Sequence, residues 1–173
     1  MGRGNPQLAR AEAHVAPVKL VAVGTDDTSS LRDVRQLFEE YQSLIDADIC
    51  FAGFSAKLEG LPGAYAAPSG SLLLAIHDEQ AVGCVALRRF DDARGEMKRL
   101  FVRPTARGLG IGRALLERVI HDARILGYRE IILDTLPTMT EAQQMYRATG
   151  FVEIAPYATH PMSGTICLGK QLD

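Results

Sequence analysis

The stretch of sequence that decides the fold is LFVRPTARGLGIGR, residues 100–113. An apolar strand pattern stops at Arg103-Pro104, because proline cannot continue a β-ladder, and a glycine-rich turn then leads directly into a helix. The first N–H groups of a helix have no partner inside the helix and carry the positive end of its dipole. Glycines at 108, 110 and 112 leave room for a ligand beside these donors. The stretch therefore predicts an anion-binding turn suited to a diphosphate.

Two familiar phosphate-binding motifs do not fit this turn. A P-loop ends in GK[ST], whereas this turn ends in Ile111-Gly112-Arg113. A dinucleotide fingerprint has the spacing G-x-G-x-x-G in the first βαβ unit, whereas here the spacing is G-x-G-x-G in the second half of the chain. Arg103, Arg107 and Arg113 flank the turn, and we expect all three guanidinium groups to surround the bound phosphate.

Periodicity on both sides of the turn predicts a mixture of strands and helices. The expected strands are 20–23, 72–76, 81–87, 94–102, 130–133, 151–154 and 165–168. The expected helices run from Ser29 or Ser30 to Leu44, over a short piece at 51–58, from the glycine turn to Gly127, and over 140–148. The fold class is therefore α/β (α+β mixed), with residues 1–17 as a flexible tail or leader and residues 18–173 as a single domain.

Two motifs in this arrangement resemble those of the GNAT superfamily of N-acetyltransferases. Residues 107–112 match its [R/Q]-x-x-G-x-[G/A] signature between the fourth strand and the third helix, after a typical lead-in at 100–104. The second motif, A-x-x-x-Y-x-x-x-G-F, is matched by Ala142, Tyr146, Gly150 and Phe151. The resemblance covers residues 20–170. It implies a twisted, mostly antiparallel sheet of six to seven strands, with splayed central strands and about four helices.

The resemblance also implies acetyl-CoA as the co-substrate, wedged between the splayed fourth and fifth strands. The residues expected to hold its pyrophosphate are Arg107, Gly108, Leu109, Gly110, Ile111, Gly112 and Arg113, and those expected beside its pantetheine arm are Leu100, Phe101 and Val102. A backbone amide near these three residues would polarise the thioester carbonyl, a contribution of about 10²–10³ in rate. Met139 stands where the family often has an asparagine that contacts pantetheine, so we expect that contact to be missing.

Tyr146 is the expected general acid, because the matching family motif places a tyrosine hydroxyl opposite the sulfur of CoA. Protonating the departing thiolate would contribute about 10²–10⁴ in rate. The alternative is a tyrosine that only fills the space between helix and sheet.

Glu96 is the expected general base, since it lies eleven residues before Arg107, a spacing at which some family members carry a catalytic glutamate. The alternative is that Glu96 is a solvated carboxylate at the strand edge beside Lys98. In that case ordered water or a backbone group would act as the base. Strict alternation along this strand would place Glu96, Lys98 and Leu100 on one face and Met97, Arg99 and Phe101 on the other.

The function expected from the resemblance is transfer of acetyl from acetyl-CoA to a primary amine of a small molecule or peptide. Transfer would be direct, in a ternary complex, because no residue has the setting of an acyl-enzyme nucleophile. One alternative is a non-catalytic acyl-CoA-binding sensor or scaffold, and another is transfer of a longer acyl group. A homodimer is compatible with the resemblance.

Composition argues against several other classes of protein. The formal net charge of −2 disfavours a nucleic-acid-binding protein, and no apolar run is long enough for a membrane span. Neither a signal peptide nor a disulfide framework is expected, so the predicted location is the cytoplasm. The three cysteines, Cys50, Cys84 and Cys167, are far apart, and the latter two lie in apolar runs typical of reduced core residues.

The remaining polar and aromatic candidates have weaker patterns. The histidines His14, His77, His121 and His160 lack metal-ligand spacing, so no metal is expected. His160 could border the acceptor site, and Asp91 and Asp92 are expected to form a turn. Phe51, Phe54 and Tyr65 fall in the region that covers the acceptor pocket in this superfamily, or belong to a satellite core.

Overall fold

A computed structural model describes residues 17–45, 58–157 and 164–173 of the chain. The described residues form one seven-stranded sheet in the order β1-β2-β3-β4-β5-β7-β6. The strands are β1 (Lys19–Ala22), β2 (Ser71–His77), β3 (Gln80–Arg89), β4 (Arg94–Val102), β5 (Glu130–Thr135), β6 (Val152–Glu153) and β7 (Ile166–Gln171). The helices are α1 (Thr28–Leu44), α3 (Ile111–Ile125) and α4 (Thr140–Ala148), with 3-10 turns at Gly63–Tyr65 and Pro104–Ala106. The strand pair β4–β5 is parallel and the other five pairs are antiparallel, which confirms the expected mixed sheet.

The helix starts differ from the sequence prediction in one detail. The N-cap of α1 is Asp27 rather than Ser29 or Ser30, because its carboxylate accepts a hydrogen bond from the backbone N–H of Ser30 at 3.1 Å. Leu44, expected on the apolar stripe of α1, is 59% exposed at the end of the helix. Most of the predicted helical piece at 51–58 lies outside the described residues.

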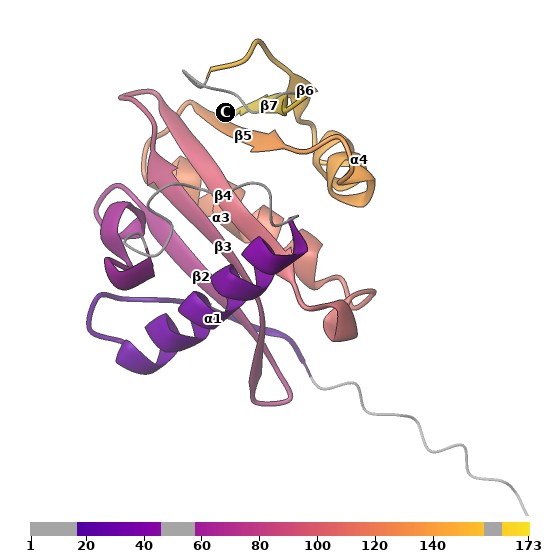
Figure 1. Cartoon of the computed structure of the whole chain (residues 1–173). Coiled ribbons are helices and arrows are strands. Elements are labelled where there is room, and N and C mark those ends of the chain that lie inside the picture. Colours follow the sequence, from indigo (N-terminus) through magenta and orange to yellow (C-terminus); the bar gives the residue numbers. More distant parts are fainter. Residues whose placement is uncertain (1–16, 46–57, 158–163) are drawn as a thin grey trace, which may run out of the picture.

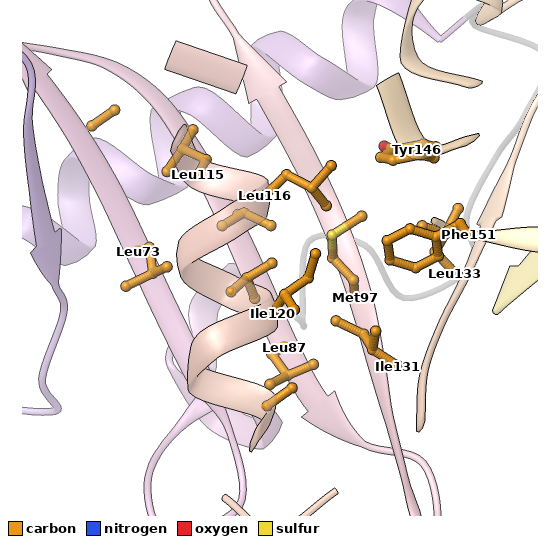
Figure 2. Packing of buried hydrophobic residues seen from close by; sticks show 14 of the residues in the cluster. Leu73, Leu87, Met97, Leu115, Leu116, Ile120, Ile131, Leu133, Tyr146 and Phe151 are labelled. Carbon is orange, nitrogen blue, oxygen red and sulfur yellow. The ribbon is translucent and has the colours of Figure 1, made fainter. Parts of the chain in front are cut away.

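Helices cover both faces of the sheet and create two apolar clusters (Figure 1). On one face α1 packs through Leu31, Val34, Leu37 and Phe38. On the other face α3 packs through Leu115, Leu116, Val119, Ile120 and Ala123, together with residues of α4 (Figure 2). Each fully buried aliphatic side chain contributes about 1.5–3 kcal/mol, so the two clusters hold the strands rigidly between the helices.

The sheet opens between β4 and β5. The two strands pair only at Arg94↔Glu130, Gly95↔Ile131 and Glu96↔Ile132, although both continue beyond these residues. In Figure 1, β5, β7 and α4 lie together above β4 and diverge from it. Backbone groups of β4 after Glu96 that face β5 therefore lie at an open edge, as expected for splayed central strands.

A β-bulge in β4 lies at the start of this opening. Two residues of β4, Arg99 and Leu100, lie opposite the single residue Val85 of β3, because Lys98 pairs with Ala86 and Phe101 with Cys84. Arg99 has a φ of 56°, a left-handed conformation that costs a non-glycine residue about 1–2 kcal/mol.

The bulge corrects the predicted faces of β4. Met97 and Leu100 both pack into the cluster beneath α3, whereas Phe101 packs into the cluster beneath α1. The guanidinium of Arg99 lies over the ring of Phe38 on the α1 face, at 5.0 Å from its centroid. The strict alternation predicted from the sequence is thus wrong. The extra residue at the bulge places the side chains that follow it on the face opposite to the one that alternation from Met97 would give.

Candidate active site

A pocket of about 870 Å³ extends from the opening between β4 and β5 to the glycine-rich turn before α3. Its walls come from β4, the glycine-rich turn, β5 and α4, and at one end from α1, β3 and Tyr65. The lining residues expected from the sequence are Leu100, Phe101, Val102, Arg107, Gly108, Gly110, Ile111, Gly112, Arg113 and Tyr146. Leu109, also expected from the sequence, is not among the lining residues and is 43% exposed.

The turn has the backbone geometry of an anion cradle. Gly108 and Gly110 have φ angles of 80° and 75°, which are strained for any residue with a side chain. Gly110 is the N-cap of α3 and has no side-chain cap, so the first N–H groups of the helix lack a side-chain partner there. A Cβ added to either glycine would meet nothing within 4 Å, so the space beside them is open to a ligand.

Two of the three arginines near the turn face the pocket. Arg107 donates to the carbonyl of Val102 at 3.3 Å, and Arg113 pairs with Glu117 at 2.8 Å; both are more than a third exposed. Arg103 does not join them. It donates from Nε and Nη2 to the two carboxylate oxygens of Glu40 at 2.8 and 2.7 Å. The prediction that three guanidinium groups surround the phosphate is therefore wrong for Arg103, which ties β4 to α1.

Arg103→Gln is expected to reduce stability while leaving acetyl-CoA affinity unchanged. The bidentate pair is partly exposed, so its loss should cost about 1 kcal/mol of unfolding free energy. Arg103 holds the pKa of Glu40 below its ordinary value, so the stabilising contribution is present above that ordinary value and is lost as pH falls through the folded pKa. Urea unfolding at pH 7 and pH 3 measures both effects: the difference between the two proteins should shrink at pH 3. An equal difference at both pH values would contradict the assignment.

Tyr146 lies on α4 at the inner wall of the pocket. Its side chain is only 6% exposed and packs against Phe151, with ring centroids 5.9 Å apart. Figure 2 shows Tyr146 beside Phe151, Leu133 and Met97, at the edge of the cluster covered by α3. Burial raises the pKa of Tyr146 above its usual value near 10. The hydroxyl is therefore protonated at neutral pH and available as a proton donor to a group in the pocket.

Glu96 lies behind the pocket wall and is not one of the lining residues. It is 2% exposed, so it is not a solvated edge carboxylate. Its Oε2 accepts from Arg88 at 2.6 Å, and its Oε1 pairs with Lys98 at 2.8 Å and accepts from the Tyr157 hydroxyl at 3.2 Å. These partners compensate the burial of a charge that would otherwise be strongly unfavourable.

Asp134 is a carboxylate of the pocket that sequence reasoning missed. It lies on β5, and its Oδ1 accepts from Lys98 Nζ at 2.6 Å, so Lys98 links Asp134 to Glu96. Both Lys98 and Asp134 line the pocket. The two residues are 36 positions apart, and the available signal was a charged residue at the end of an apolar strand beside the predicted opening.

The other sequence candidates have structural explanations or lie outside the described residues. Cys84 and Cys167 are buried free thiols, as expected. Asp91 accepts from the backbone N–H groups of Ala93 and Arg94, which confirms its role in a turn. Met139 and Tyr65 line the pocket. The remaining candidates in this group are His14, Cys50, Phe51, Phe54 and His160, whose positions are outside the described residues.

Two further features bear on the class of protein. Within residues 17–45, 58–157 and 164–173, no helix has the length and apolar character needed to cross a membrane. The same residues contain no cluster of three or more side chains suited to holding a metal ion.

Known proteins share both the sequence pattern and this architecture. The chain matches the Acetyltransferase (GNAT) family over residues 31–151. It is 36% identical to an uncharacterised N-acetyltransferase of Schizosaccharomyces pombe, over 82% of this chain and 88% of that protein.

Solved structures show the same fold at low sequence identity. An acetyltransferase from Streptococcus agalactiae superposes with a TM-score of 0.76 at 24% identity, over 90% of this chain and 98% of that chain. A GNAT family acetyltransferase from Elizabethkingia anophelis, solved with acetyl-CoA bound, gives a TM-score of 0.58 at 19% identity, over 90% of this chain and 98% of that one. Together with the family match, these similarities establish that the chain is an acyltransferase of the GNAT acetyltransferase family.

Proposed function

We propose that the protein transfers the acetyl group of acetyl-CoA to a primary amine of a small molecule or peptide, directly and within a ternary complex. The observation that carries the proposal is the continuous pocket that joins the anion cradle, the open edge of β4 and Tyr146. A diphosphate at the cradle and a thioester between β4 and β5 would place the reacting carbonyl near the charged side chains at the start of the opening.

Cofactor binding follows from the backbone of β4 and the turn. The N–H groups at the start of α3 would donate hydrogen bonds to the pyrophosphate, and Arg107 and Arg113, which line the pocket, would lie beside it. Leu100 to Val102 would hold the pantetheine arm, because β4 has no pairing with β5 there. A β4 amide at this edge would polarise the thioester carbonyl.

Proton transfer involves groups at two sides of the pocket. The acceptor's ammonium gives its proton to the carboxylate network linked by Lys98, and the neutral nitrogen then attacks the carbonyl carbon. Asp134 is the member of the network that lines the pocket, and Glu96, the base expected from the sequence, acts through it or through water. The C–S bond of the resulting tetrahedral adduct then breaks as the Tyr146 hydroxyl donates its proton to the departing sulfur. The nitrogen loses its second proton to solvent as the neutral amide forms, and the phenolate is reprotonated from solvent.

Direct transfer is supported by the residues that line the pocket. They include no cysteine, serine or histidine in the part of the chain that the structure describes. Cys84 is buried beneath α1, where burial raises the pKa of its thiol, so it remains a protonated core residue. An acyl-enzyme on either described cysteine is therefore disfavoured.

Calorimetric titration with acetyl-CoA, CoA and NAD, followed by a screen of amines with detection of released thiol, tests the proposal. We expect acetyl-CoA and CoA to bind and NAD not to bind, with thiol release that depends on an amine. Acetyl-CoA binding without amine-dependent thiol release across amino acids, peptides, polyamines and arylalkylamines would contradict it.

Two carboxamide variants separate the roles of the linked carboxylates. Asp134→Asn should lower kcat/KM by about 10²-fold, since a proton acceptor that lines the pocket is lost. Glu96→Gln should instead lower the unfolding free energy by about 2 kcal/mol. The Glu96 carboxylate is buried, and its loss leaves Arg88 and Lys98, which are partly exposed to solvent, without this ion-pair partner. Rate–pH profiles and urea unfolding of both variants measure the split. If Asp134→Asn keeps the wild-type kcat/KM while a folded Glu96→Gln protein loses it, then Glu96 is the direct base.

A further inference from the structure

The end of the pocket on the α1 face carries aromatic and basic side chains that are not needed to bind acetyl-CoA. Tyr41, Tyr65 and Arg99 line this end. The ring of Tyr41 lies 5.9 Å from that of Phe101, and the ring of Tyr65 lies 6.2 Å from that of Phe38, over which the Arg99 guanidinium is stacked. These contacts place the three lining side chains together, on the side of the sheet opposite α3.

Arg88 also lines the pocket, and the buried carboxylate of Glu96 fixes its guanidinium. Its Nε and Nη2 both contact the single oxygen Oε2 of Glu96, each at 2.6 Å. A guanidinium has five N–H donors, so one carboxylate oxygen does not use them all. The side chain is 37% exposed and lines the pocket, so donors remain for a ligand there. A guanidinium fixed by a buried carboxylate is preorganised for binding a second carboxylate.

The left-handed backbone conformation of Arg99 supports a functional role independently of these contacts. At a φ of 56° the bulge favours glycine, yet this position carries the longest basic side chain, directed into the α1 face of the pocket. Strained conformations of this kind concentrate at functional sites. The side chain that accompanies the strain is therefore a candidate for ligand recognition.

Tyrosine hydroxyls add neutral donors to this end of the pocket. Burial raises the pKa of Tyr41 to about 12, so its hydroxyl is protonated at neutral pH. A protonated hydroxyl can donate a hydrogen bond to an anion without adding charge. Lys98 contributes a third cation beside the two guanidinium groups.

We infer that the acceptor is an amine that also carries a carboxylate, an amino acid or a related amino carboxylate, whose carboxylate is bound by Arg88 and Arg99. The amine end then lies toward Asp134 and the thioester. This inference rests on the proposed acetyl transfer and adds the substrate class. Arg88, Lys98 and Arg99 outnumber their carboxylate partners Glu96 and Asp134 at this end of the pocket. A polyamine would add positive charge to this excess and is disfavoured relative to an amine that carries a carboxylate.

The first experiment compares each amino acid that has a primary amine with its own carboxamide, so that the two acceptors differ only in the carboxylate charge. Spermidine is offered as a polycationic acceptor, and thiol released from acetyl-CoA is measured in every case. For the best acceptor, kcat/KM should exceed that of its carboxamide by at least about 30-fold, the effect of removing one partner of a hydrogen-bonded charge pair. Equal use of acid and amide, or faster use of spermidine, would overturn the inference while leaving acetyl transfer intact.

Variants of Arg99 assign the effect to this pocket. Arg99→Gly should raise the acceptor KM by at least about tenfold with the melting temperature maintained or raised, because glycine accepts the left-handed backbone. Arg99→Lys should retain part of the preference for the acid. An Arg99→Gly protein that still prefers the acid over its amide would overturn the assignment.

A binding measurement separates failure of this inference from failure of the proposed transfer. Calorimetric titration of the protein–CoA complex with N-acetylated amino acids and with their carboxamides requires no turnover. If the wild-type protein binds the acid but not its amide, and Arg99→Gly does not bind the acid, then the carboxylate site is supported even if no amine is acetylated. Acetylation of amines without any such binding preference supports the transfer and rejects the carboxylate site.

Discussion

Gly110→Glu is expected to lower acetyl-CoA affinity by about 10³-fold. Gly110 is the left-handed N-cap of α3, and the space beside it is where the pyrophosphate would lie. A carboxylate about 4 Å from a phosphate charge costs about 4 kcal/mol at an effective dielectric constant of 20, which corresponds to about 10³ in affinity. Calorimetric titration with acetyl-CoA measures the loss directly.

Gly127→Glu is a matched control at the opposite end of the same helix. Gly127 has a φ of 84°, no atom within 4 Å of an added Cβ, and no place in the pocket lining. The two variants therefore share the added charge and the backbone strain but not the proximity to the cradle. A negative charge is favoured at the N-terminal end of a helix and disfavoured at its C-terminal end, so we expect the larger loss of unfolding free energy in Gly127→Glu. We expect a loss of acetyl-CoA affinity in Gly110→Glu alone. Equal affinities in the two variants would mean that the pyrophosphate does not bind at this turn.

Tyr146→Phe is expected to lower kcat by about 10³-fold, within the range for removal of a general acid. The phenyl ring preserves the packing against Phe151, so acetyl-CoA affinity and the melting temperature should change little. Because burial raises the pKa of Tyr146, the wild-type rate should show no alkaline loss from this group until the pH exceeds its usual pKa of about 10. Steady-state kinetics over a range of pH measures both effects.

Tyr128→Phe provides the corresponding control for the loss of a buried hydroxyl. Tyr128 belongs to the same apolar cluster, and its hydroxyl donates to the carbonyl of Ser69 at 2.6 Å, away from the pocket. Its removal should cost about 1 kcal/mol of unfolding free energy and leave kcat unchanged. If Tyr146→Phe behaves like Tyr128→Phe, losing stability but not rate, then Tyr146 is a packing residue and the thiolate leaves without its help.

The bulge at Arg99 shows how a local irregularity limits prediction from alternation. The limits of β4 and its end at Arg103-Pro104 were predicted correctly from the apolar pattern and the proline. The pattern contains no glycine at the bulge, and a positive φ at arginine is too uncommon to expect. One extra residue then reversed the faces of the following side chains, so the α1 side of the pocket received Arg99 and Phe101 together.

The sequence by itself determined the cradle, the sheet that carries it and the placement of Tyr146 on a short helix. These features are local, since turn glycines, a helix start and strand periodicity are encoded by residues within a few positions of one another. The tertiary structure alone decided which charges meet. Arg103 pairs with Glu40 across 63 positions, and Lys98 joins Asp134 across 36. Such contacts depend on strand register, on the opening between β4 and β5 and on the position of α1, because a side chain several ångströms long finds its partner only after the backbone elements are packed.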